Sequence, residues 1–192
     1  MEIFRTSDPA EAMRFAQECL TGQKAGLDVF FNESVFLQTG VTNTSDKDAA
    51  RALGIPVWEA RHTGGSIVCF PGDLSLCMIW RQGCDPADRW MRICARLLEE
   101  RGAAVTFDHN DVLADGRKVA SWANAGLPDG WMQTVAHFSV NVDLGLIRKL
   151  CTKPMIKTPG ALSEYGITAE MLWGEIRELI ELKNFKKGAE TC

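Results

Sequence analysis

The sequence predicts an α+β fold in one domain, and three observations carry this prediction. The chain has 192 residues, close to the size of one ordinary domain. Its composition, 46% hydrophobic and 24% charged, is typical of a globular protein with a sizeable core. Strand-like segments occur in runs with helical segments between them, without the regular alternation of a doubly wound sheet.

The first half of the chain contains a capped helix, a short helix and several strand-like runs. Ser7 or Asp8 can cap the free amides of a helix and Pro9 fits its first turn, so we expect a helix from there to about residue 22. A short helix over 45–53 is expected to end at Gly54. Aromatic and β-branched content predicts strands over 27–31, 35–37, through 57, and over 67–70 and 74–80.

The second half contains the clearest helix, which opens at Asp85-Pro86 and ends at Gly102. Its apolar side chains recur at the spacing of one buried helical face. Further strands are expected over 104–107, 112–114, 118–122 and 131–142, with helices over 144–150 and from 168 to about 183. The segment 152–166 contains two prolines and is expected to be a surface loop.

Composition and patterning exclude several classes of protein. A net charge of −4 without long like-charge blocks predicts no binding of nucleic acid. No apolar run approaches the ~18 residues of a membrane span, and the N-terminus resembles no secretory signal, so a cytoplasmic protein is expected. Seven cysteines without a C-x-x-C pair and three scattered histidines predict neither a disulfide framework nor a structural metal.

One glycine pair lies between two predicted strands, in the segment 61–66. Gly64 and Gly65 let a backbone approach a ligand closely or adopt a positive φ, and Arg61 offers paired donors for phosphate or carboxylate. The segment matches neither a P-loop nor a dinucleotide fingerprint. Taken alone, it favours a tight turn that carries a surface arginine over a ligand site.

A hairpin signal, Asp115-Gly116, joins two later strands. The expected pairs across this hairpin are Ala114 with Arg117, Leu113 with Lys118, and Asp111 with Ala120. Asp111 and Lys118 then share one face as diagonal neighbours, with Cα atoms roughly 7–8 Å apart. We also expect Trp122 on that face, where it would shelter Lys118. A sheltered lysine beside a carboxylate could hold an anionic ligand, and the alternative is an exposed hairpin charge.

Four segments, taken in order, carry a family resemblance. They are Arg61-His62-Thr63-Gly64-Gly65-Ser66-Ile67-Val68, Asn110-Asp111, Lys118-Val119-Ala120-Ser121 and Asn141-Val142-Asp143-Leu144. Together they resemble the lipoate–protein ligase and octanoyltransferase family, which is related to the catalytic domain of biotin–protein ligases. The resemblance extends from about residue 9 to 180. It implies a mostly antiparallel sheet flanked by helices, in a single catalytic domain over 1–192 without a C-terminal accessory domain.

The resemblance also implies roles for individual residues. Lys118 would be the catalytic lysine, contacting the acyl carbonyl and the α-phosphate of an acyl-adenylate. Asn110 and Asp111 would place the nucleotide or Mg²⁺. The remaining residues expected to bind substrate or nucleotide are Arg61, Thr63, Gly64, Gly65, Ser66, Ile67, Val68, Ala120 and Ser121. ATP, Mg²⁺ and lipoate follow as ligands, and a lipoyl domain or a glycine-cleavage H-type protein follows as acceptor.

Departures from the family pattern leave three functions open. Ala60 precedes Arg61 where ligases often carry a second arginine, Phe70 stands in place of a histidine, and His137 is shifted from the family's His-Gly pair. The chain is then an ATP-dependent ligase, an ATP-independent transferase with a thioester on Cys151, or a non-catalytic accessory subunit. Cys151 follows Asp143 by eight residues, where the transferase nucleophile follows by about ten, so the sequence favours a structural cysteine at a helix end over a nucleophile.

Overall fold

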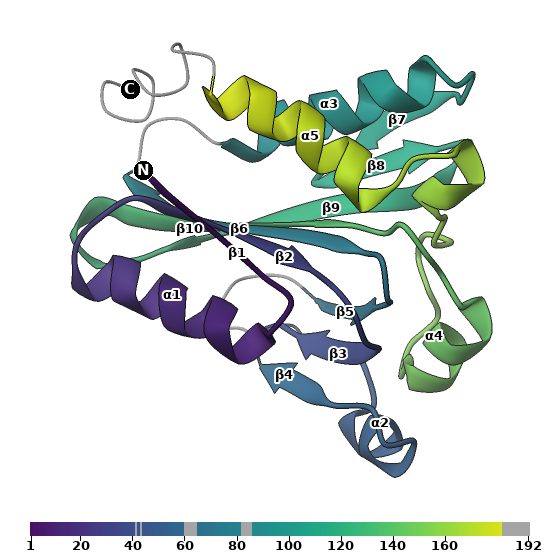
Figure 1. Cartoon of the computed structure of the whole chain (residues 1–192). Helices are drawn as coiled ribbons and strands as arrows, with labels where there is room; N and C mark the ends of the chain where they lie inside the picture. Colours follow the sequence, from purple (N-terminus) through teal and green to yellow (C-terminus); the bar gives the residue numbers. More distant parts are fainter. Residues whose placement is uncertain (41, 43, 60–64, 82–85, 182–192) are drawn as a thin grey trace.

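A seven-stranded and a three-stranded sheet form the frame of the molecule, with helices packed around them (Figure 1). The computed structural model describes residues 1–40, 42, 44–59, 65–81 and 86–181. The large sheet has the order β1 (Glu2–Thr6), β2 (Gly26–Phe31), β6 (Leu74–Arg81), β10 (Trp131–Phe138), β9 (Arg117–Gly126), β8 (Asp111–Ala114) and β7 (Val105–Asp108). The small sheet has the order β4 (Val57–Glu59), β3 (Phe36–Thr39) and β5 (Ser66–Cys69). Apart from the parallel β1–β2 pair, all pairs in the large sheet are antiparallel, which confirms the expected fold class.

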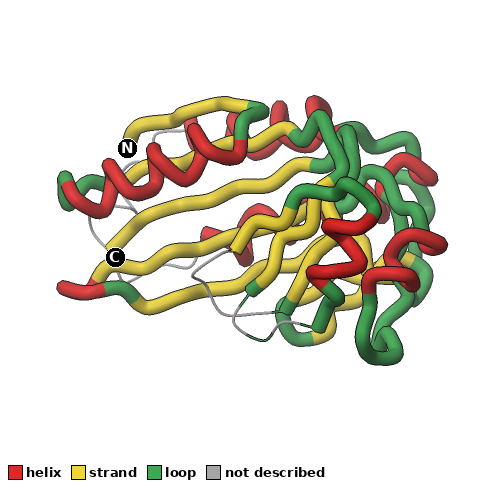
Figure 2. The backbone as a smooth tube through the Cα atoms, turned by 90° about the horizontal axis from the view of Figure 1, so that it is seen from below, coloured by secondary structure: helices red, strands yellow, loops and turns green. Residues whose placement is uncertain are grey.

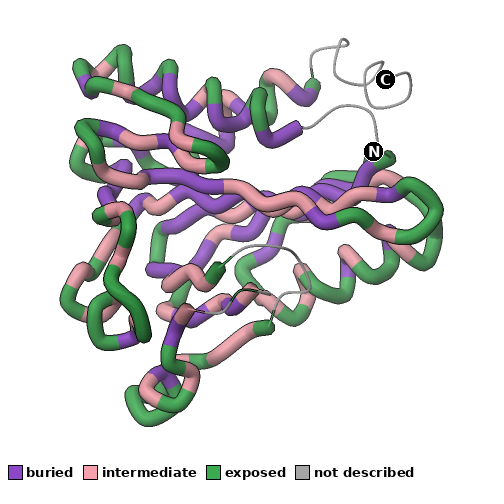
Figure 3. The backbone as a smooth tube through the Cα atoms, turned by 180° about the vertical axis from the view of Figure 1, so that it is seen from behind, coloured by how far each residue is buried: buried purple, intermediate pink, exposed green. Residues whose placement is uncertain are grey.

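The helices cover both faces of the large sheet. They are α1 (Pro9–Thr21), α2 (Lys47–Ala52), α3 (Pro86–Glu99), α4 (Leu144–Leu150) and α5 (Ala169–Glu181), with 3-10 turns η1 (Pro128–Gly130) and η2 (Leu162–Tyr165). The main core lies between α3, α5 and one face of the sheet. On the other face, α1 runs along the strands beside the small sheet (Figure 2). Buried residues concentrate along the central strands between these layers (Figure 3).

Local sequence signals position most helix boundaries correctly. Asp8 accepts a hydrogen bond from the amide of Ala10 at 2.8 Å and caps α1, and α4 has the expected bounds. The sequence did not predict β1, whose residues are mostly exposed at the edge of the sheet. Within the described residues, no helix has both the length and the apolar character of a membrane span.

The expected hairpin register is wrong beyond Leu113. Ala114 pairs with Arg117 and Leu113 with Lys118 as predicted, but Asp111 lies opposite Ser121 and not opposite Ala120. A β-bulge between Val112 and Leu113 in the ladder causes the shift, because it adds one residue to β9. The bulge also moves Trp122 to the opposite face, where it packs against the main core and does not shelter Lys118.

Candidate functional site

Two lysines converge on one carboxylate at the β8–β9 hairpin. Lys118 Nζ lies 3.0 Å from Asp111 Oδ1, which confirms the predicted contact. Lys157, from the segment between α4 and η2, places its Nζ 2.6 Å from Asp111 Oδ2 and 2.8 Å from Asp108 Oδ2. The sequence did not single out Lys157. The side chains of Asp111 and Lys157 are only 16% and 20% exposed, so this lysine cluster of Lys118, Lys157, Asp108 and Asp111 is partly sheltered from water.

Electrostatics favours the charged forms of Lys157 and Asp108 in this cluster. Burial acts against the charge of Lys157, but hydrogen bonds with Asp108 and Asp111 outweigh it, and the pKa of the ammonium is raised. The hydrogen bond from Lys157 lowers the pKa of Asp108. Two cations held beside carboxylates over β7, β8 and β9 form a site that a phosphate or carboxylate ligand can enter.

The segment 152–166 begins as the expected surface loop, and its residues 158–160 dock against β9 beside Lys118. The Lys118 amide donates to Thr158 O at 2.9 Å, and the Gly160 amide donates to Lys118 O at 2.8 Å. A Cβ on Gly160 would lie 2.9 Å from Arg117 Cβ and 3.1 Å from Val119 Cγ1. Only glycine therefore allows the approach that brings Lys157 to Asp111.

Gly160→Val is expected to lower the free energy of unfolding by about 1–3 kcal/mol, because the added side chain overpacks the contact with β9. The docked segment should also become cleavable by trypsin at Lys157 without global unfolding. Gly174→Ala is the matched control, since a Cβ at Gly174 in α5 would meet nothing within 4 Å. Urea denaturation and limited proteolysis measure both effects, and equal behaviour of the two variants would refute this role of Gly160.

A cavity of about 360 Å³ lies on the α1 face of the large sheet, between α1 and the small sheet. Its walls are mainly apolar and include Phe30, Phe36, Trp58 and Val135. The volume lies within the range of small-molecule sites. This acyl-sized pocket was not predicted from the sequence, because its lining comes from α1 and five strands distant along the chain.

A row of residues across the sheet links the pocket to the lysine cluster. By register the row is Phe30, Ser75, His137, Ser121 and Asp111, on β2, β6, β10, β9 and β8 in turn. Its first two members line the pocket and its last member holds both lysines. At ~4.8 Å per strand, Ser75 and Asp111 have Cα atoms roughly 14 Å apart.

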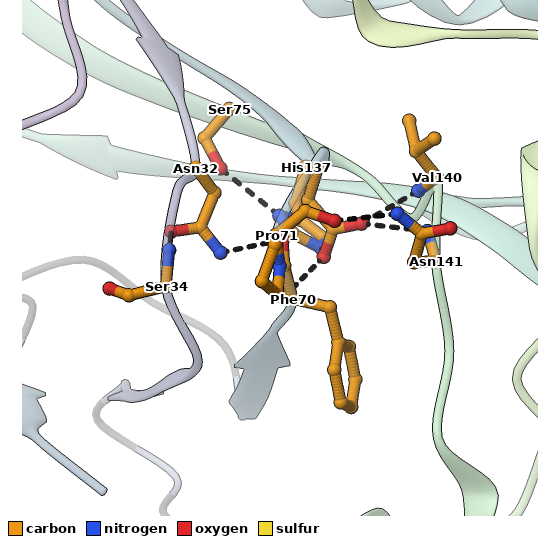
Figure 4. Close-up of polar contacts among 9 residues, drawn as sticks. Asn32, Ser34, Phe70, Pro71, Ser75, His137, Val140 and Asn141 are labelled. Atoms are coloured by element: carbon orange, nitrogen blue, oxygen red, sulfur yellow. Dashed lines mark hydrogen bonds and ion pairs between the residues drawn. The ribbon is translucent and has the colours of Figure 1, made fainter.

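The buried carboxylate of Asp73 fixes the middle of this row. Its Oδ1 accepts the amides of Val140 at 2.7 Å and Asn141 at 3.0 Å, and its Oδ2 accepts the amide of Phe70 at 2.8 Å (Figure 4). These bonds pull the chain out of the ladder after Phe138, so β10 ends earlier than the expected 131–142.

His137 connects Asp73 to the pocket. Its Nε2 lies 3.4 Å from Asp73 Oδ2, and its Nδ1 lies 3.0 Å from the Ser75 hydroxyl (Figure 4). Asn32 completes the cluster by donating to Phe70 O at 2.7 Å. The histidine that the family pattern places elsewhere therefore holds the strand row together from within the protein.

The glycine turn lies only partly within the described residues. Arg61, Thr63 and Gly64 fall outside them, whereas Gly65 leads into β5 and its carbonyl accepts the Gly40 amide at 2.9 Å. Ser66 Oγ accepts the Thr44 amide at 3.4 Å. Ile67 and Val68 pack into the two cores on either side of the small sheet. The turn is thus attached to the sheet whose β3 and β4 line the pocket.

The other predicted site residues, Asn110, Ala120 and Ser121, differ in burial and in the face of the sheet on which they lie. Asn110 is exposed in the β7–β8 turn, and its carbonyl accepts the Trp122 amide at 3.0 Å. Ser121 is buried in the row, whereas Ala120 lies in the main core on the side of α3 and α5.

Cys151 ends α4 and bridges by its backbone to Ser45. Burial raises the pKa of its thiol, which disfavours the thiolate that a nucleophile requires. Within the described part of the chain, no three His, Cys, Asp or Glu side chains gather closely enough to hold a metal ion.

Comparison with known proteins supports the fold through structure alone. No protein-family model and no curated protein sequence matches the chain. P. falciparum LipL1, solved in complex with lipoate, matches 96% of this chain with a TM-score of 0.76 at 13% identity. The chain spans 62% of the length of that protein.

Two further solved structures extend this likeness. A bipartite lipoate–protein ligase from Thermoplasma acidophilum matches 94% of this chain and 82% of its own, with a TM-score of 0.71 at 16% identity. A biotin protein ligase from Leishmania major, in complex with biotinyl-5-AMP, matches 97% of this chain and 81% of its own, with a TM-score of 0.52 at 12% identity. The chain therefore has the fold of the lipoate–protein ligase catalytic domain, which biotin protein ligases share.

Proposed function

We propose that this protein is a lipoate–protein ligase-like enzyme, which activates lipoate or a related medium-chain acid with ATP and transfers the acyl group to a lysine of a lipoyl domain. One observation carries the proposal. The apolar pocket and the lysine cluster lie at the two ends of one row on the same face of the sheet. An acyl chain in the pocket can thus direct its carboxyl group toward Lys118.

The chemistry assigns Lys118 to charge stabilisation in two steps. In the first, a carboxylate oxygen attacks the α-phosphorus of ATP and pyrophosphate leaves. In the second, the amine of the acceptor lysine attacks the acyl carbonyl, an amide forms and AMP leaves. Negative charge grows on phosphate and carbonyl oxygens in turn, and a fixed ammonium beside both stabilises each transition state. Lys157 supplies a second cation at the same place.

The residues of the lysine cluster suit the binding of a nucleoside triphosphate. Two ammonium groups beside Asp111 provide the positive charge that phosphates require. Both Asp111 oxygens already contact lysines, so Mg²⁺ would be held mainly by phosphate and water, with Asp108 or Asp111 as the protein ligand. Asn110, Ser121 and the turn from Arg61 to Val68 remain the proposed nucleotide and acyl contacts.

Related structures guide the choice of acceptor. A lipoate–protein ligase A structure with a TM-score of 0.71 is bound with ATP, and the T. acidophilum ligase was described together with its E2 lipoyl domain. A lipoyl domain or a glycine-cleavage H-type protein is accordingly the proposed acceptor for this chain. A separate accessory subunit, as in a bipartite ligase, is the proposed further partner.

Acyl loading of a lipoyl domain is expected to require ATP and Mg²⁺, to release pyrophosphate and to survive Cys151→Ser. The reason is that an adenylate needs no thiol, and burial already disfavours the Cys151 thiolate. Intact-mass analysis of the acceptor and a pyrophosphate assay measure these outcomes. Loading from an acyl-carrier thioester without ATP, with an acyl adduct on Cys151, would instead establish the transferase. Failure of both assays with several acceptors would favour an accessory subunit.

A further inference from the structure

The pocket contains a buried carboxylate that the proposed reaction does not use. Asp28 lies on β2 and lines the pocket, although it is only 3% exposed. Its Oδ1 has no hydrogen-bond partner within the described chain, and no ion pair with Asp28 occurs there. A buried acceptor without a partner destabilises the folded protein, so its presence requires an explanation.

Among the described residues, none offers the Asp28 carboxylate a compensating positive charge. Across the ladder stands Cys77, whose sulfur receives a hydrogen bond from Gln133 Nε2 at 3.3 Å. On the α1 side lies the buried thiol of Cys19, whose pKa is raised by burial and, to a smaller extent, by the charge of Asp28. Burial raises the pKa of Asp28 to about 7, partly opposed by a hydrogen bond from the Val29 amide. A lysine, arginine or histidine would have lowered it instead.

Asp28 lies in the part of the pocket that is away from the lysine cluster. By register Asp28 lies opposite Cys77, then Val135, then Ala123 of β9. Three strand spacings and five residues along β9 separate it from Lys118, so the two Cα atoms lie roughly 20 Å apart. A medium-chain acid together with an extended lysine side chain covers such a distance.

We propose that the acid bound in this pocket carries a hydrogen-bond donor, a hydroxyl or an amino group, at the end of its chain, and that Asp28 Oδ1 accepts this bond. The inference rests on the proposed function, because it assigns the pocket to the acyl chain. Within that function it favours a related medium-chain acid over lipoate, whose dithiolane end carries no hydrogen-bond donor. Asp28 then selects against plain alkyl acids, since an apolar chain end would leave the carboxylate buried and unpaired.

Three acids of equal chain length test the proposal by calorimetry: octanoate, 8-hydroxyoctanoate and 8-aminooctanoate. The wild-type protein is expected to bind both donor-bearing acids at least tenfold more tightly than octanoate. Asp28→Val should reverse this order and raise the melting temperature of the free protein, because valine suits a strand and removes the unpaired carboxylate. Asp28→Asn should keep the hydroxy acid within about threefold but weaken the amino acid, since the amide oxygen accepts a bond without charge.

Asp88→Ala is the matched control, because Asp88 lies on α3, against the opposite face of the sheet, and should change none of these affinities. Equal or tighter binding of octanoate by the wild-type protein would overturn the proposal, as would binding of none of the three acids. Pyrophosphate release with the same acids separates this inference from the proposed function. Release with octanoate as the preferred acid refutes only the role of Asp28, whereas donor-selective binding without release refutes only the ligase reaction.

Discussion

Lys118→Ala is expected to lower the rate of acyl transfer by about 10³-fold or more, since one preorganised donor to a developing charge contributes on this scale. The fold should stay intact, because Asp111 keeps its contact with Lys157 and is not left as an unpaired buried charge. The Lys118 side chain is 35% exposed and fills no core position. Activity and thermal melting measured on the same sample test both statements.

Two further variants test whether the expected loss of activity is specific to Lys118. Lys157→Ala should reduce the rate less, because the second cation lies against Asp108 as well as Asp111 and supports the site from the docked segment. Lys149→Ala, at an exposed position of α4, should leave the rate unchanged. Near-normal activity of the Lys118 variant would show that the resemblance fails at this position.

Asp73→Ala is expected to lower the free energy of unfolding by about 3–5 kcal/mol, because it leaves three backbone amides in the interior without an acceptor. Asp73→Asn should cost less, since its amide oxygen can still accept two of the three. Asp48→Ala, whose side chain is 93% exposed, serves as control. Urea denaturation gives the three values, and a loss below about 1 kcal/mol for Asp73→Ala would contradict the assigned role.

Local signals were enough to predict the contact between Asp111 and Lys118. They share a hairpin whose turn, Asp115-Gly116, fixes the nearest pairs. The predicted pairing is wrong beyond Leu113 because the consecutive residues Val119 and Ala120 are both buried. A β-bulge allows this, whereas the strict alternation of a regular strand does not. Nothing in the local pattern distinguishes the extra residue, because Val119 and Ala120 are buried by elements distant along the chain.

The rest of the site depends on contacts distant in sequence. Lys157 meets Asp111 across 46 residues, and Asp73 reaches Asn141 across 68. Periodicity and capping describe single elements, so they predicted α1 and α4 well but indicated neither the docked segment nor the pocket. Asp28 shows this most clearly. It is the one charged residue in the hydrophobic strand β2, and its position there is explained by the cavity beside it, which the local sequence does not indicate.

The contact between Gly160 and β9 also has a consequence for the order in which the molecule assembles. Asp111 and Lys118 come together when a hairpin closes, which is a fast, local event. Lys157 can join them only after the chain has passed through β10 and α4 and returned, which is a slow closure over a long loop. Lys118 thus reaches its place in the site early in folding, and Lys157 reaches its place late. A nascent or partly opened chain would have Lys118 in place but not Lys157. Binding of a phosphate ligand would therefore stabilise the form in which the segment of Lys157 has docked.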